Sequence, residues 1–236
     1  MSTKNIVWVA KKEFRYLTYL PTGYVFAFIL IGLASWMFVD DLLLIRVADL
    51  RPYWGVLGFM LSLFVPAVAM NLVAEEKRQG TWELMLSWPL TAKDIVLGKF
   101  VGALVYVWGT LLLSLVLVAS VWWLSGADIG VLLGGLLGTG LLAASYLALG
   151  LLVSVLSPSP VVAFLITLVI LLLNNLLATE TLLMRFGPGL VRLASALSLS
   201  ARAETMQSGL ISLPDGLFFI SWSLVILWLA IQKLKK

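Results

Sequence analysis

Three glutamates lie close together in a chain that is otherwise poor in charge. Glu75, Glu76 and Glu83 share one strip with Lys77 and Arg78, whereas 61% of the chain is hydrophobic and only 12% is charged. Carboxylates grouped on one surface complement basic side chains of a protein partner and fix its orientation. The strip therefore predicts a docking surface, and the alternative is an ordinary helix that is solvated at a membrane surface.

Several kinds of chemistry are excluded by what the chain lacks. It has no cysteine and no histidine, which excludes disulfides, thiolate metal sites, cysteine nucleophiles and a Ser-His-Asp triad. The dipeptide Gly98-Lys99 is followed by Phe100 and lacks the upstream glycine of a phosphate-binding loop. We therefore expect no catalytic, metal or cofactor site in this chain, so any ATP and Mg²⁺ that drive it would be bound by a partner.

The residues around the strip predict a short helix held under the membrane. We expect the preceding span to continue through Arg78 and to stop at Gly80, a favoured residue just after a helix. Thr81 then caps a new helix with Glu83 in its first turn, and Pro89 ends that helix. The stretch Thr91–Asp94 has the pattern of a capping box that opens the next span.

The long apolar runs predict an all-α membrane protein. About 20 apolar residues cross a hydrocarbon core as a helix, and the runs lack the alternation that a membrane β-barrel requires. We expect one transmembrane domain over residues 1–236. Its six spans are predicted at about 22–39, 53–73, 99–124, 129–156, 160–178 and 216–232.

The basic residues predict how the spans are oriented. With six spans, all nine lysines, Arg15 and Arg78 fall on the side that holds both termini, which makes eleven of the 16 basic residues. By the positive-inside rule, that side is cytoplasmic. The same bias toward the lipid surface explains the pI of about 9.4 without a nucleic-acid partner.

Two further segments are predicted to be amphipathic helices. Residues 1–20 alternate apolar and charged side chains at near-helical spacing, as in a helix that lies on the inner membrane surface before Pro21. On the outer side, Leu190, Leu193 and Leu197 form an apolar stripe, so we expect a short amphipathic or re-entrant helix between residues 189 and 200.

Small and polar residues inside the spans suggest how the helices pack. Gly130, Gly134 and Gly138 recur every fourth residue, which predicts close helix packing either within the chain or at a subunit interface. Asn174 and Asn175 near the outer end of the fifth span favour interhelical hydrogen bonds. No acidic or basic residue falls in the central part of a span, so the chain has no evident proton or sodium relay.

The strip resembles the hallmark of type-2 ABC exporter permeases, in which a Glu-Glu-basic pattern followed by Gly-Thr-x-Glu and a proline joins spans two and three. It is most similar to the branch that contains the gliding-motility permease and the nitrous-oxide-reductase maturation permease. The turn at residues 157–160 departs from the Glu- or Asn-bearing turn of the family. The matching residues are Glu75, Glu76, Gly80, Thr81, Glu83 and Pro89.

The resemblance implies a transmembrane subunit in the inner membrane that pairs with a second copy or a paralogous permease and with two cytoplasmic ATPase subunits. In that family the helix after the Gly-Thr pair is the coupling helix, which inserts in the ATPase. We expect ATP-driven export of a substrate that the sequence leaves open. The alternatives are mechanical transmission or assembly without a transported solute, and an ATP-independent scaffold.

Overall fold

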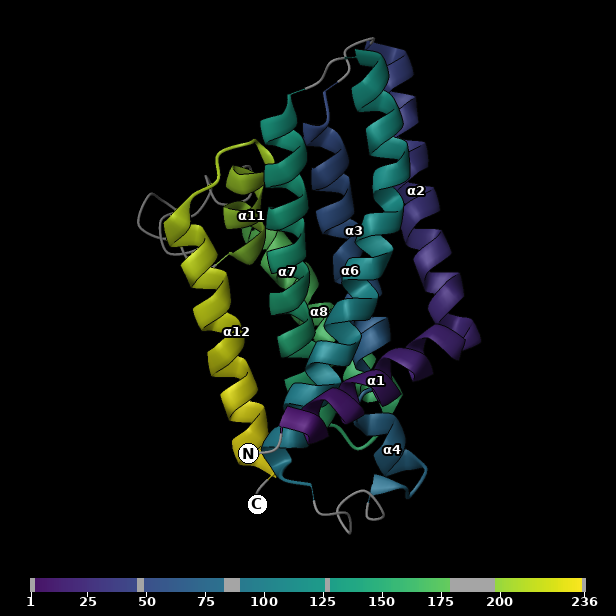
Figure 1. Ribbon diagram of the computed structural model, residues 1–236, viewed down its shortest axis with the longest axis vertical. Coiled ribbons are helices and arrows are strands. Elements are labelled where there is room, and N and C mark those ends of the chain that lie inside the picture. Colours follow the sequence, from purple (N-terminus) through teal and green to yellow (C-terminus); the bar gives the residue numbers. More distant parts are fainter. Residues whose placement is uncertain (1–2, 46–48, 83–89, 126–127, 179–197, 235–236) are drawn as a thin grey trace.

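The computed structural model describes residues 3–45, 49–82, 90–125, 128–178 and 198–234, and every regular element in these ranges is a helix (Figure 1). In chain order the helices are α1 (Thr3–Tyr19), α2 (Pro21–Ile45), α3 (Arg51–Ala69), α4 (Ala74–Arg78), α6 (Ala92–Ser125), α7 (Ile129–Leu156), α8 (Pro160–Ala178), α11 (Leu199–Gln207) and α12 (Leu213–Leu234).

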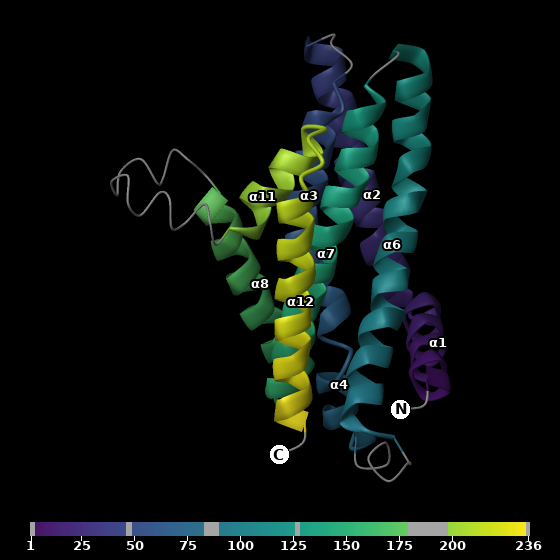
Figure 2. The same cartoon turned by 60° about the vertical axis from the view of Figure 1, so that its left-hand side comes forward.

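Among the described residues, six helices are long and apolar enough to cross a membrane, which agrees with the predicted number of spans. They are α2, α3, α6, α7, α8 and α12, and each overlaps one of the predicted segments. These helices run roughly along the long axis of the bundle, while α1 lies across its lower end against α6 (Figures 1 and 2). The prediction of an all-α membrane protein is confirmed.

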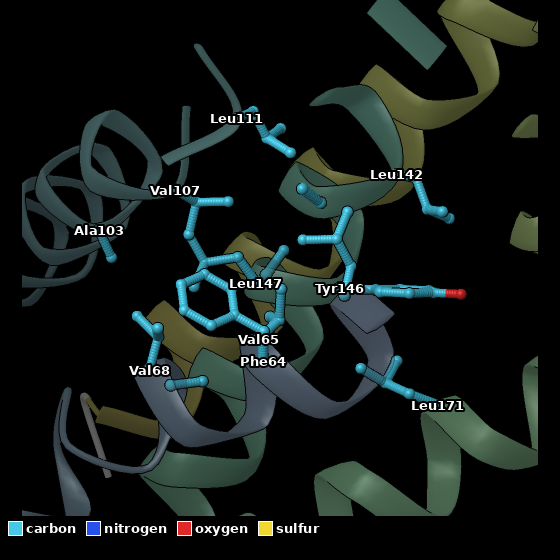
Figure 3. Packing of buried hydrophobic residues seen from close by; sticks show 14 of the residues in the cluster. Phe64, Val65, Val68, Ala103, Val107, Leu111, Leu142, Tyr146, Leu147 and Leu171 are labelled. Atoms are coloured by element: carbon cyan, nitrogen blue, oxygen red, sulfur yellow. The ribbon is translucent and has the colours of Figure 1, made fainter. Parts of the chain in front are cut away.

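Helix α7 lies at the centre and carries much of the core. It packs against α3, α6, α8, α11 and α12. Its side chains Leu142, Tyr146 and Leu147 are buried in one cluster with Phe64 and Val65 of α3, and Leu147 lies beside Val65 (Figure 3). Because this core forms between the spans, the outward faces of α2, α8 and α12 remain apolar and exposed, as expected of surfaces in contact with lipid.

Two of the three regularly spaced glycines of α7 lie against another helix of the same chain. A methyl group built at Gly134 would lie 2.5 Å from the carbonyl oxygen of Met206, and one built at Gly138 would lie 2.8 Å from the Met206 Cβ. Gly130 instead meets only the Asp128 side chain, which accepts a hydrogen bond from its N–H. Gly134 and Gly138 therefore let α11 approach α7 closely.

The second span ends earlier than the sequence suggests. We expected one helix through Arg78, but α3 ends at Ala69 and α4 begins at Ala74. The hydroxyl of Ser154 on α7 accepts hydrogen bonds from the N–H groups of Val73 (3.1 Å) and Ala74 (3.0 Å), which caps the start of a new helix. This long-range cap, 80 residues away in sequence, is not visible in local patterns.

The two ends of the bundle carry different short helices. Both chain termini and α4 lie at one end, whereas α11 lies toward the other (Figure 1). The helix predicted for 189–200 falls almost wholly outside the described residues. The described helix α11 begins at Leu199, where the Ser198 hydroxyl accepts a hydrogen bond from the Ala201 N–H at 3.2 Å.

Candidate functional site

Helix α4 is a five-residue segment whose end is closed by a Schellman motif. The N–H of Thr81 donates to the carbonyl of Glu76 at 3.0 Å, and the N–H of Gly80 donates to that of Lys77 at 3.2 Å. Gly80 has a φ of +69°, a left-handed conformation that glycine adopts without steric cost. The predicted stop at Gly80 is therefore observed, and it fixes the direction in which the chain leaves α4.

Between Thr81 and α6 the structure describes only the two ends of the connecting segment. Trp82 packs against the core at one side. At the other side, the Thr91 N–H donates to the Asp94 carboxylate at 3.1 Å and the Asp94 N–H donates to the Thr91 hydroxyl at 3.3 Å. This reciprocal pair is the predicted capping box, and it starts α6 at Ala92. Glu83, Pro89 and the predicted coupling helix lie outside the described residues.

Three ionisable side chains meet where α1, α4 and α6 come together. The Lys99 Nζ of α6 lies 2.9 Å from Glu13 Oε2 of α1 and 2.9 Å from Glu76 Oε1 of α4. Lys99 is 1% exposed and Glu13 is 2% exposed. We call Glu13, Glu76 and Lys99 the Lys99 cluster. Lys12 approaches the same Glu76 oxygen at 3.5 Å from the solvent side.

Burial determines the electrostatics of this cluster. Burial raises the pKa of the Glu13 carboxyl, and the adjacent Lys99 ammonium acts in the opposite direction. One oxygen of each carboxylate, Glu13 Oε1 and Glu76 Oε2, has no hydrogen-bond partner within the described part of the chain. Both residues border a polar hollow of about 220 Å³ that Tyr16 also lines.

Helix α1 is held close to α6 by two glycines on either side of Lys99. A methyl group at Gly98 would lie 2.5 Å from the Cβ of Val9, and one at Gly102 would lie 2.5 Å from the carbonyl oxygen of Ala10. A larger residue at either position would push α1 away from α6. The close approach brings Glu13 within reach of Lys99.

Helix α4 is also joined to α7. Besides the Ser154 cap on Val73 and Ala74, the Lys77 ammonium donates a hydrogen bond to the carbonyl of Val155. This carbonyl belongs to the last turn of α7, where backbone acceptors have no intrahelical donor and favour a cation. The five residues of α4 thus connect to α1 and α6 on one side and to α7 on the other.

The two neighbouring glutamates of the strip lie in different surroundings. Glu75 accepts hydrogen bonds from two exposed residues of its own turn, Arg78 Nη2 (2.6 Å) and Gln79 Nε2 (2.6 Å). Glu76 faces inward to Lys99. Both carboxylates thus already pair with cations of their own chain, whereas the sequence had suggested them for arginines of a partner.

Sequence reasoning did not assign a role to Glu13 or Lys99. A signal for both is present in the sequence. Glu13 follows Val9 and precedes Leu17 at four-residue intervals, which places it on the buried face of α1. The spacing of Gly98 and Gly102 marks a close helix crossing next to Lys99.

Comparison with known families agrees with this architecture. The model of the family described as ABC-2 family transporter protein matches residues 7–188, a range that begins in α1 and extends past α8. A search of the curated proteins found no match to the chain. The family implies a partner ATPase in the cytoplasm, and its members are generally non-catalytic membrane subunits. The chain belongs to the ABC-2 family of transporter proteins, as a membrane-embedded permease subunit of an ABC transporter.

Proposed function

We propose that α4 and the segment that follows it receive the force of the ATPase and pass it to the spans. The observation that carries this proposal is the position of α4 between α1 and α6, through the Lys99 cluster, and α7, through Ser154 and Lys77. A displacement of α4 is thereby passed directly to two of the six spans. The end of the bundle that holds α4 and both termini would face the cytoplasm, as the distribution of lysines predicts.

The chemistry of the Lys99 cluster suits a joint that stays closed under load. Removing one partner of a buried ion pair costs about 3–5 kcal/mol, because the remaining charge is left buried without compensation. Exposed ion pairs contribute at most about 1 kcal/mol and exchange readily with water. We expect α1, α4 and the start of α6 to move as one unit, since separating them would break these buried ion pairs at that cost in free energy.

The residues matched to the family pattern then have distinct tasks. Glu76 joins α4 to Lys99, while Gly80 and Thr81 close α4 and direct the chain toward the ATPase. Glu75 holds Arg78 at the surface. We expect Glu83 and Pro89 to belong to the coupling helix that the family pattern predicts, and Glu83 to pair with an ATPase arginine.

We infer that ATP binding brings the two ATPase subunits together and rocks the spans, which changes access from the inner to the outer side. The permease would work beside a second copy or a paralogue. Export fits the family pattern of the strip, and the transported substrate stays open. In the alternative, the same motion acts on a partner outside the membrane and no solute crosses.

Association with the ATPase tests the docking half of this proposal. The permease is co-purified with its candidate ABC ATPase subunit, as wild type, as Glu83→Arg and as Asp49→Arg. Asp49 is a control acid that precedes α3 and is paired with Arg51. We expect Glu83→Arg to lose the ATPase and Asp49→Arg to retain it. Full retention by Glu83→Arg would contradict the docking assignment.

Transmission is tested separately by a distance measurement. The chain contains no cysteine, so spin labels can be placed at Lys93→Cys on α6 and Gln232→Cys on α12, both exposed. We expect the distance between them to change on ATP binding in the complex. In Lys99→Met the ATPase should still bind, but the change in distance should shrink. An unchanged response in Lys99→Met would exclude the Lys99 cluster as the joint.

A further inference from the structure

Helix α1 presents a basic stripe on the side opposite the Lys99 cluster. Lys4, Trp8, Lys11 and Arg15 follow one another at intervals of four, three and four residues, which places them on one face of the helix. All four are exposed. Within the described residues, the three basic side chains form no ion pair. The coupling role of α4 makes no use of this stripe.

Two adjoining hollows lie along this helix. The first, about 330 Å³, is shallow and is lined by Lys4 and Lys11, with Val7 and Trp8 between them. The second, about 250 Å³, is an apolar groove between α1 and α6. Val7 and Lys11 line both hollows, so the basic surface runs directly into the groove.

The apolar groove faces away from the protein core. From α1 it is lined by Val7 and Phe14, and from α6 by Val101 and Val105. These side chains remain 37–52% exposed. The bare backbone of Gly102 forms part of the groove, since glycine has no side chain to fill it. The groove has the apolar lining and the exposure that a lipid acyl chain requires.

We propose that this face of α1 is a binding site for one anionic phospholipid. An acyl chain lies in the groove beside Val101 and Val105, and the headgroup phosphate lies between Lys4 and Lys11. Charge complementarity selects this occupant, because unpaired ammonium groups at a membrane surface attract anionic headgroups and favour zwitterionic ones much less. Trp8 stands between the two lysines, a residue type enriched at the level of the headgroups.

The proposal requires only that the bundle lies in a membrane, and it does not depend on the coupling role of α4. Lys4 and Lys11 lie two helical turns apart, about 10.5 Å along the axis at 1.5 Å per residue. A diester phosphate with its glycerol fits between two flexible lysine side chains at this spacing. The lipid would hold α1 against α6 from the side opposite Glu13.

Lipid retention by the purified full-length protein tests this site. The protein is held in a mild detergent and offered phosphatidylglycerol and phosphatidylcholine with identical acyl chains, and bound lipid is counted by native mass spectrometry. We expect one phosphatidylglycerol to be retained roughly tenfold better than phosphatidylcholine. Lys4→Gln/Lys11→Gln should bring this ratio close to one, while Lys93→Gln/Lys233→Gln, with the same loss of charge at the same end, should leave it unchanged.

The groove has its own control. Val101→Phe/Val105→Phe fills it and should reduce retention of both lipids, whereas Leu113→Phe, an exposed apolar position elsewhere on α6, should not. Glycerophosphoglycerol, a headgroup without acyl chains, should fail to compete. Equal selectivity in Lys4→Gln/Lys11→Gln and wild type would overturn the proposal, as would an equal loss in the Lys93→Gln/Lys233→Gln control. Effective competition by the free headgroup would show a phosphate site in place of a lipid site.

Discussion

The two ends of the bundle hold their short helices by different chemistry. At the end that carries both termini, α4 is joined to α1 and α6 by the buried charges of the Lys99 cluster. Toward the opposite end, called the neutral end after these contacts, α11 is joined to α7 and α8 by neutral groups, and its Arg202 adds a partly exposed ion pair with Asp215 of α12 at 2.9 Å. There the Ser200 hydroxyl lies 2.8 Å from the Tyr146 hydroxyl and 3.0 Å from the Asn175 amide oxygen.

This difference predicts how each end responds to damage. A buried charge that loses its partner stays buried without compensation, so a single substitution should destabilise all the helices that the charged cluster joins. A neutral network with several acceptors around one hydroxyl loses a single bond at a time, each worth about 1 kcal/mol. Ser200 also lies 3.2 Å from the Asn174 amide oxygen, so its bonds are shared. The charged end is therefore suited to transmit force and the neutral end to maintain shape.

The largest effect is expected from Lys99→Met. Methionine fills a similar volume but leaves Glu13 and Glu76 buried without the cation that both contact. We expect the free energy of unfolding to fall by about 3–5 kcal/mol. Unfolding in detergent micelles, followed by tryptophan fluorescence over a denaturant series, measures this loss.

A triple variant separates lost charge balance from lost packing. Lys99→Met with Glu13→Gln and Glu76→Gln removes all three charges and keeps similar shapes, so most of the lost stability should return. If the triple variant is as unstable as Lys99→Met alone, packing rather than charge stabilises this end. That result would remove the contrast between the two ends.

The next largest effect concerns glycines at both ends. Gly102→Ala places a methyl group 2.5 Å from the Ala10 carbonyl oxygen, and Gly134→Ala places one 2.5 Å from that of Met206. We expect each to lose about 1–3 kcal/mol of unfolding free energy, as for other overpacked positions. Gly109→Ala, with nothing within 4 Å of the new methyl group, is the control and should lose nothing.

The same glycines distinguish function from stability. Gly102→Ala displaces α1 and should weaken the Glu13–Lys99 contact, so the response of α6 to ATP should fall along with stability. Gly134→Ala should reduce stability while the ATP response of the folded protein persists. If both variants reduce the ATP response equally, coupling is not confined to the charged end.

Much of the fold follows from local and periodic signals in the sequence. Long apolar runs specify the six spans, because a lipid-exposed helix needs only length and apolar side chains. The stop at Gly80 and the cap formed by Thr91 and Asp94 were predictable, since each motif is contained within a few residues. The regular spacing that includes Gly134 likewise predicted a close helix contact, although only the structure identifies α11 as the partner.

Long-range pairing was not predictable from one sequence. The break between α3 and α4 depends on Ser154, which lies about eighty residues away and looks like any helical serine. Lys99 looked like part of a failed nucleotide loop, and its partner Glu13 like one charge among several on a surface helix. Their pairing becomes evident only when α1 is packed on α6, because an ion pair between separate helices produces no periodic pattern in the sequence.

A smaller effect is expected at the neutral end from Tyr146→Phe. The change removes one hydroxyl, 2.8 Å from that of Ser200, while both asparagine oxygens remain near Ser200. We expect a loss of about 0.6–1 kcal/mol in unfolding free energy. The denaturant series used for Lys99→Met measures it. A loss as large as that of Lys99→Met would show that the neutral end is equally cooperative.

The smallest effect should come from Glu75→Gln, with its neighbour Glu76→Gln as the matched variant. Glu75 accepts hydrogen bonds from Arg78 and Gln79, whose exposed side chains water can solvate after the change, so the unfolding midpoint should not shift measurably. Glu76→Gln removes a charge that contacts buried Lys99 and should lower the midpoint clearly. Both changes remove one negative charge from α4, so a general effect of charge on this end would move them together. A measurable shift in Glu75→Gln of the same size as in Glu76→Gln would mean that net charge, not the contact with buried Lys99, sets the strength of the α4 joint.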